Sequence, residues 1–126
     1  MNQPSPSKNH KQSLGKRGEQ IAATYLTEHG YTIIERNFKA RYGEIDLIAT
    51  KGTCLVFVEV KTRKSDAYGG PEEAITPRKL HEVIQTAQYY SLCHNTLDRP
   101  QRIDAIAIMI DAMSAPHIHH IENISQ

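Results

Sequence analysis

The sequence lacks any long apolar run. No stretch approaches the roughly 18 to 20 apolar residues that a membrane-spanning helix needs, so we expect no membrane association. The polar segment 1–13, which contains two prolines, has no stretch apolar enough for a signal peptide. It predicts a disordered leader ahead of one domain over 14–126, because a chain of this length supports a single core. We therefore expect a cytoplasmic protein.

The sequence is also poor in cysteine, with only Cys54 and Cys93. The two residues lie far apart and in different expected elements. This is neither a disulfide framework nor the clustered spacing of a zinc site. We expect both to be reduced thiols in or near the core.

The formal net charge is only +1, so no overall excess of positive charge indicates nucleic-acid binding. Basic residues are nevertheless grouped before the first expected helix and at the end of an expected strand: Lys8, Lys11, Lys16, Arg17, Lys61, Arg63 and Lys64. Because phosphate contacts are made locally, such groups can bind nucleic acid in a near-neutral chain. Scattered, solvated side chains explain any one group at least as well.

Two stretches have the periodicity of amphipathic helices. Apolar residues at helical spacing predict one helix over 14–29, with Ser13 positioned to cap its start. Thr76 is a favoured N-cap residue and Pro77 occupies the first helical position after it. They predict a second helix that runs to about Cys93.

Short runs rich in β-branched and aromatic residues predict the strands of a sheet. Two short turns separate the first three runs, which should form an antiparallel meander. The fourth run follows the second helix and is most simply parallel to the third, and a weaker edge strand follows it. The expected strands are 31–38, 44–49, 54–62, 102–110 and 118–124, with a loop over 63–75. The order α-β-β-β-α-β predicts an α/β fold with a mixed sheet flanked by helices.

Charged residues interrupt the apolar pattern of two neighbouring strands. By strand alternation Asp46 and Ile48 share one face, and Ile45 takes the other. On the next strand Glu59 and Lys61 share a face. Because the charged ends of an antiparallel pair are neighbours, we expect Asp46, Glu59 and Lys61 together at one edge of the sheet.

Paired carboxylates near a core repel each other unless a cation lies between them. Oxygen ligands without histidine or cysteine suit a hard ion such as Mg²⁺ or Mn²⁺, which can polarise a phosphoryl oxygen. Lys61 is then placed to neutralise charge that develops on a phosphate, and Glu19 of the first helix to reach the same ion. The competing interpretation is a solvated strand face, on which acids and lysines alternate by chance.

A resemblance to the PD-(D/E)XK nuclease superfamily is carried by two motifs, Gly43-Glu44-Ile45-Asp46-Leu47-Ile48 and Val56-Phe57-Val58-Glu59-Val60-Lys61-Thr62-Arg63. Over about 15–110 the chain is similar to the YraN family of small bacterial proteins, described as uncharacterised and endonuclease-like. The resemblance implies a restriction-endonuclease-like fold. It implies Asp46, Glu59 and the Val60 carbonyl as metal ligands, with Lys61 and Glu19 in catalytic roles. The superfamily's proline before the aspartate is replaced here by Ile45.

The resemblance further implies an endonuclease that uses Mg²⁺ or Mn²⁺ to hydrolyse DNA. Branched or structured DNA is the expected substrate by analogy with archaeal Holliday junction resolvases. Enzymes of that kind work as homodimers, because a symmetric junction presents two equivalent cuts. The alternative is a nucleic-acid-binding or interaction module that keeps the scaffold without turnover.

Several other residues have two interpretations each. Arg63, Lys64, Lys79 and Gln85 are candidate nucleic-acid contacts, and simple solvation competes with this role. Arg102 and Asp104 suit a structural ion pair as well as a functional one. A metal site at the histidine-rich tail is disfavoured, because alternation separates its last histidine from the other two and no carboxylate or thiol completes the set: His117, His119 and His120.

Overall fold

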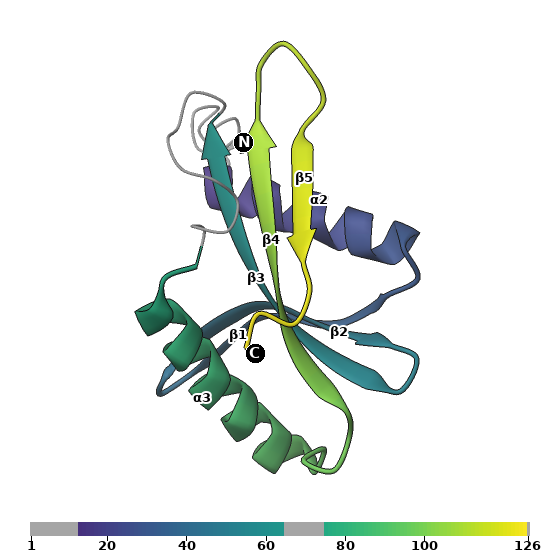
Figure 1. Ribbon diagram of the computed structural model, residues 1–126, viewed down its shortest axis with the longest axis vertical. Helices are drawn as coiled ribbons and strands as arrows, with labels where there is room; N and C mark the ends of the chain where they lie inside the picture. Colours follow the sequence, from purple (N-terminus) through teal and green to yellow (C-terminus); the bar gives the residue numbers. More distant parts are fainter. Residues whose placement is uncertain (1–12, 65–74, 126) are drawn as a thin grey trace, which may run out of the picture.

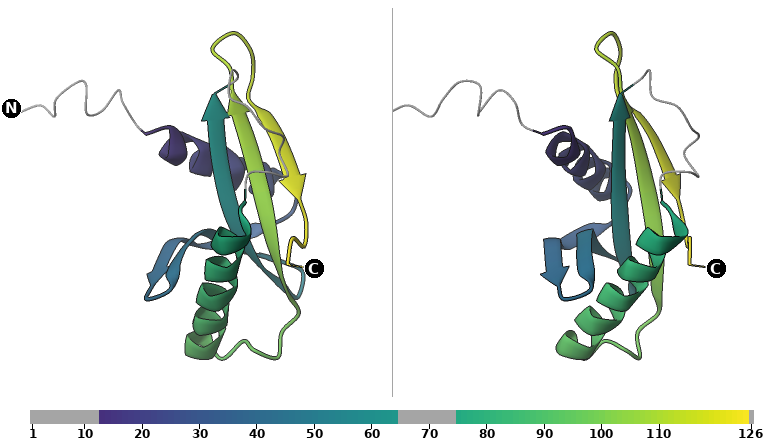
Figure 2. Two further views of the ribbon diagram at one scale, coloured as in Figure 1. Left: turned by 60° about the vertical axis from the view of Figure 1, so that its left-hand side comes forward. Right: turned by 90° about the vertical axis from the view of Figure 1, so that its left-hand side faces the viewer.

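A mixed five-stranded sheet with one helix on each face makes up the fold (Figures 1 and 2). The computed structural model describes residues 13–64 and 75–125. The sheet order is β1-β2-β3-β4-β5, and only the β3–β4 pair is parallel. The elements are α2 (Leu14–Glu28), β1 (Thr32–Ala40), β2 (Gly43–Lys51), β3 (Cys54–Lys64), α3 (Pro77–His94), β4 (Gln101–Ile110) and β5 (His117–Ile121).

This architecture confirms the expected α/β class and the α-β-β-β-α-β order, including the helical crossover between two parallel strands. The expected caps are also present. The Ser13 hydroxyl accepts a hydrogen bond from the Lys16 N–H, and Thr76 does the same for Lys79, each at 3.1 Å. The expected leader lies outside the described residues apart from Ser13. No helix in the described segments is long and apolar enough to span a membrane.

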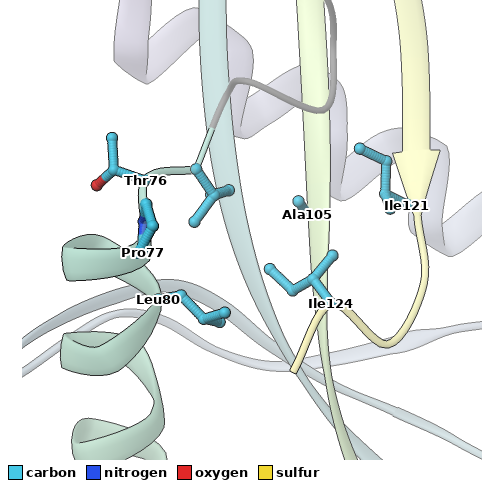
Figure 3. A pocket seen from close by; sticks show the side chains of 7 residues that line it. Thr76, Pro77, Leu80, Ala105, Ile121 and Ile124 are labelled. Carbon is cyan, nitrogen blue, oxygen red and sulfur yellow. The ribbon is translucent and has the colours of Figure 1, made fainter. Parts of the chain in front are cut away.

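Each face of the sheet contributes to one hydrophobic cluster. The cluster under α2 consists of Ala22, Ala23, Leu26, Tyr31, Leu47, Ala49, Val56, Val58, Ile106 and Ile108. The cluster under α3 consists of Ile45, Ile48, Leu55, Phe57, Val83, Ala87, Tyr90 and Ile103. An apolar hollow lies beside the second cluster, between the first turn of α3 and strands β4 and β5 (Figure 3). The residues that line it include Pro77, Leu80, Ala105, Ile121 and Ile124.

Strict alternation along β2 was a wrong prediction. Ile45 and Ile48 lie in the same cluster, under α3, whereas Leu47 lies under α2. The strand therefore changes phase between Ile45 and Leu47. The physical reason is that pairing with β3 stops at Leu47, opposite Val58, so among the described strands only β1 still pairs with the preceding residues of β2.

Two further expectations need correction. Arg63 and Lys64 were expected in a loop, but β3 continues through both of them, because the parallel ladder with β4 extends to Lys64 opposite Ile110. Cys93 was expected in or near the core, but it lies exposed near the end of α3. Cys54 is half-buried against the α2 cluster, and both thiols are free.

Gly18 allows α2 to lie directly against β3. A Cβ at this position would come 1.7 Å from the Thr62 hydroxyl oxygen and 2.8 Å from the Thr62 Cβ. Any side chain would therefore push the helix off the strand. Because Glu19 is the next residue, this contact also fixes how close the Glu19 carboxylate comes to the sheet.

We expect Gly18→Ala to lower the free energy of unfolding by about 1–3 kcal/mol, since an overpacked contact forces backbone to move. Gly15→Ala is the matched control in the same helix, because a Cβ there has nothing within 4 Å. It should raise stability by about 0.5–1 kcal/mol through helix propensity. Urea unfolding of the two variants measures both effects, and equal changes would contradict the close packing of Gly18.

Candidate metal centre

The candidate site forms where β2 and β3 separate. Beyond the Leu47–Val58 pair, the Asp46 carboxylate takes the place of a ladder partner and its Oδ2 accepts a hydrogen bond of 2.7 Å from the Val60 N–H. In an extended strand the N–H and C=O of one residue point to the same side. The Val60 carbonyl is therefore directed toward the same gap.

Glu59 brings the second carboxylate to this gap. It is only 8% exposed, although it is charged at neutral pH in an ordinary environment. Burial, followed by the charge and hydrogen bonding of Asp46, raises the pKa of Glu59 to about 8. Burial likewise raises the pKa of Asp46 to about 6, against the opposing effect of its hydrogen bond from Val60. Both carboxylates are therefore destabilised when ionised.

The positive charge at the gap comes from Lys79, in the first turn of α3. Its Nζ lies 3.6 Å from Glu59 Oε2. Glu59 Oε1 is buried and has no hydrogen-bond partner in the described part of the chain. One ammonium group therefore faces two carboxylates, and an acceptor that could take a strong partner remains unused.

This donor set fits a hard divalent cation. Mg²⁺ is commonly bound through one or two carboxylates together with waters and substrate phosphates, not by a complete protein cage. Asp46, Glu59 and the Val60 carbonyl match that pattern. No group of three or more histidine, cysteine, aspartate or glutamate side chains within 13–64 and 75–125 is arranged to hold a metal. The set is thus suited to Mg²⁺ or Mn²⁺ and not to a closed structural site.

Glu19 lies at the edge of the same gap, half-buried on α2. Its charge contributes to the raised pKa of Asp46. Glu19 Oε1 accepts a hydrogen bond of 3.1 Å from the Asn37 side-chain amide. Asn37 has a left-handed backbone with φ of 52°, a conformation that asparagine tolerates better than most residues. The sequence did not predict a role for Asn37. The signal that could have indicated one is an asparagine within a run of β-forming residues.

The basic residues that the sequence predicts for the site do not all lie beside its carboxylates. Lys61 is exposed and forms no hydrogen bond or ion pair within the described segments. Lys64 is exposed beside Arg17 at the rim of an open hollow between α2 and the end of β3. Gln85 is half-buried on α3. The structure therefore brings Lys79, and not Lys61, to the paired carboxylates.

A second group of buried polar side chains lies on the α2 face of the sheet. Asp104, which is fully buried, accepts two hydrogen bonds from Arg102 at 2.9 and 3.0 Å and one from His120 at 2.8 Å. The Asn123 N–H adds another at 3.0 Å. Burial alone would raise the pKa of Asp104, but these partners hold it below its ordinary value.

The three tail histidines lie in different surroundings. The His120 ring also contacts the Tyr25 hydroxyl at 3.2 Å, so it ties β5 to α2. His117 and His119 are exposed on the other face of β5. The alternation expected for the three histidines is confirmed. The Arg102–Asp104 ion pair is also present, as one part of the larger network.

Stability without metal should fall as the pH rises, because the raised pKa of Glu59 means that the folded state favours its protonated form. This favourable contribution is complete below about pH 4.5 and is lost as pH rises through about 8. Glu59→Gln should therefore raise the free energy of unfolding at pH 8 by about 1–3 kcal/mol and flatten its pH dependence. The exposed Glu28→Gln is the control and should change neither. Urea unfolding in EDTA across this pH range tests the sign.

Comparison with known proteins identifies relatives over most of the chain. The model of the uncharacterised protein family UPF0102 matches residues 18–108. A UPF0102 protein of Geobacter sulfurreducens is 46% identical over 114 residues, which cover 90% of this chain and 89% of the relative. A UPF0102 protein of Chlorobium phaeobacteroides is 48% identical over 105 residues, which cover 83% of each chain.

Among solved structures, similarity is found to Hjc, a Holliday junction resolvase of Archaeoglobus fulgidus. The identity is 18% and the TM-score 0.47, over 83% of this chain and 75% of that one. This similarity is too low to transfer an activity. The sequence relatives establish the family: the chain belongs to the uncharacterised protein family UPF0102, the YraN family to which its strand motifs pointed.

Proposed function

We propose that this protein is a metal-dependent endonuclease that hydrolyses phosphodiester bonds of DNA. The observation that carries the proposal is a pair of carboxylates, the half-buried Asp46 and the buried Glu59, where β2 and β3 separate. The Lys79 ammonium group lies beside Glu59. A purely structural site gains nothing from this pair, because each carboxylate raises the cost of ionising the other. A bound divalent cation removes that cost. The resemblance of both strand motifs to the PD-(D/E)XK core supports the same assignment.

The chain's own residues have distinct roles in this proposal. Asp46, Glu59 and the Val60 carbonyl hold the cation, which when bound polarises a phosphoryl oxygen and makes water a better nucleophile. The hydrogen bond from the Val60 N–H fixes one Asp46 oxygen, which orients the other. Lys79 favours the ionised form of Glu59 through its ion pair.

Two further residues act on the substrate side. Lys61, exposed two residues beyond Glu59 on the same strand, supplies positive charge for a phosphate that approaches the site. Glu19 adds negative charge beside Asp46 and strengthens the attraction for the cation. Branched or structured DNA as substrate, and a homodimer as the working form, are proposed on the resemblance to resolvase-like nucleases.

Cleavage of DNA in Mg²⁺ or Mn²⁺ is the first expected outcome. A panel of single-stranded, duplex, flap and junction DNA, with RNA alongside, should contain at least one substrate that the protein cuts. Asp46→Ala and Glu59→Ala should each lower the rate by at least about 100-fold, because each removes a charged ligand. Gel electrophoresis of end-labelled substrates measures the rates.

The control for this experiment is Glu28→Ala, which removes an exposed carboxylate at the far end of α2. It should cut at the rate of the unchanged protein. Activity that survives either Asp46→Ala or Glu59→Ala would point to a different site or a contaminant. A failure of Mg²⁺ and Mn²⁺ to raise the unfolding temperature, together with metal-independent DNA binding, would favour the non-catalytic module.

The two lysines should separate into different effects. Lys79→Ala removes the positive charge that competes with a cation for Glu59, so Mn²⁺ should bind more tightly in isothermal titration calorimetry. Lys61→Ala should leave Mn²⁺ affinity unchanged and lower the cleavage rate by roughly 100-fold or more, as removal of one electrostatic contact to a transition state does. The reverse pattern would assign the catalytic role to Lys79.

A further inference from the structure

On the side of the sheet that carries α3, the upper ends of β3, β4 and β5 carry no helix of the described residues (Figure 1). α3 packs against β1 and β2, at the other end of this face. The pairing register places the side chains of this open area in rows across the three strands. One row is Lys61–Ala107–His119, and the next is Arg63–Met109–His117.

These rows form a strip with basic side chains along its β3 edge and histidines along its β5 edge. Its floor consists of Ala107 and Met109, which are half-buried. Lys61 and Arg63 border it on β3, and the exposed His117 and His119 border it on β5. We call this area the histidine strip. Adjacent strands lie about 4.8 Å apart, so its two edges are about 10 Å apart.

The strip leads directly to the candidate metal centre. The row before Lys61–Ala107–His119 is Glu59–Ala105–Ile121, so the strip begins at a proposed metal ligand. Successive rows are two residues apart, about 7 Å along the strands. This repeat is comparable with the spacing of successive phosphates in an extended nucleic-acid strand. A backbone that lies along the floor would meet one pair of edge side chains per phosphate.

We propose that the histidine strip binds the phosphates of a single, unpaired nucleic-acid strand and leads that strand to the metal centre. The inference deepens the proposed function and rests on it for the direction of the strand. The Lys61 ammonium group neutralises phosphate charge, and the imidazole N–H of His117 or His119 donates to a phosphate oxygen. Contact from both edges of so narrow a strip fits one backbone and leaves no room for a second.

Two acidic residues of the described segments follow the strands of the strip, and each has a partner. The Asp111 carboxylate accepts a hydrogen bond from the Met113 N–H beyond the end of β4. Glu122 lies 3.8 Å from Arg102, on the opposite face of the sheet. Within the described part of the chain, no carboxylate lies in the rows of the strip between Glu59 and Asp111, which include Lys61, His117 and His119. The charge pattern complements a polyanion.

Binding in EDTA, where metal-dependent cleavage cannot occur, tests the strip apart from catalysis. Fluorescence anisotropy of a labelled single-stranded oligonucleotide gives the dissociation constant and its salt dependence. The double variant His117→Ala/His119→Ala should weaken binding at least about fivefold, as expected for two lost hydrogen bonds to charged groups. Lys61→Ala should reduce the slope of log affinity against log salt by about 0.7, the value for one phosphate contact on a single strand.

Two further variants keep the test independent of folding. His119→Lys retains a donor and adds charge. Its affinity for the single strand should therefore equal or exceed that of the unchanged protein, and its salt slope should be steeper by about 0.7. His81→Ala removes an exposed histidine from α3 and should change neither value. Unchanged single-strand affinity in the double variant would overturn the proposal, as would a loss confined to duplex DNA.

The outcome is separable from that of the nuclease proposal. If the double variant binds single strands weakly but no substrate is ever cut, the strip is supported and the nuclease function is not. If the protein cuts DNA and the double variant binds and cuts a single strand at the original rate, the nuclease function stands and the strip is overturned.

Discussion

The hydrogen bond between the Asp46 carboxylate and the Val60 N–H is the interaction on which the site depends. It stands where a ladder bond between β2 and β3 would otherwise continue, and it thereby allows the two strands to part without leaving a buried N–H unpaired. The gap that results admits the Glu59 side chain and the end of Lys79. A backbone–backbone bond at the same place would close the sheet and remove the site.

The two buried acids Asp104 and Glu59 differ in how their charge is balanced. Asp104 receives hydrogen bonds from Arg102, His120 and the Asn123 backbone, and the pKa of Asp104 is lowered. Glu59 has one ion pair, its Oε1 has no hydrogen-bond partner among residues 13–64 and 75–125, and its pKa is raised to about 8. The charge of Asp104 is balanced by its partners, whereas a cation at Glu59, as proposed, would balance a charge that Lys79 balances only in part.

Most of the fold could be predicted from the sequence because the hydrophobic pattern, the caps and the short turns all indicate the same order of elements. The convergence of Asp46 and Glu59 could also be predicted, but the reason given for it was incomplete. Alternation assumes a continuous ladder, and β2 changes phase at Ile45 because that ladder ends. Whether a ladder ends depends on a contact between strands, which no local pattern encodes.

The position of Lys79 beside Glu59 could not be predicted for the same reason. Its proximity to Glu59 follows from how the first turn of α3 sits over the sheet after the crossover, and sequence spacing carries no information on that placement. Lys61 was easier to predict, because the ladder between β3 and β4 is unbroken past Glu59 and Lys61, so these two residues share a face. Local periodicity therefore identifies residues within an element reliably, and packing between elements decides which of them meet.

β3 joins these separate features into one line. Its residues that face α2 are apolar from Val56 to Val60 and polar at Thr62, whereas the residues on its other face change from Phe57 to Glu59 and then to Lys61. The strand thus passes from the core to the proposed metal centre and then to the exposed Lys61 within a few residues. Gly18 lets α2 pack against the same strand at Thr62, so the helix that carries Glu19 is positioned by the strand that carries the ligands. A displacement of α2 at the Gly18–Thr62 contact should therefore move Glu19 relative to Asp46 and Glu59.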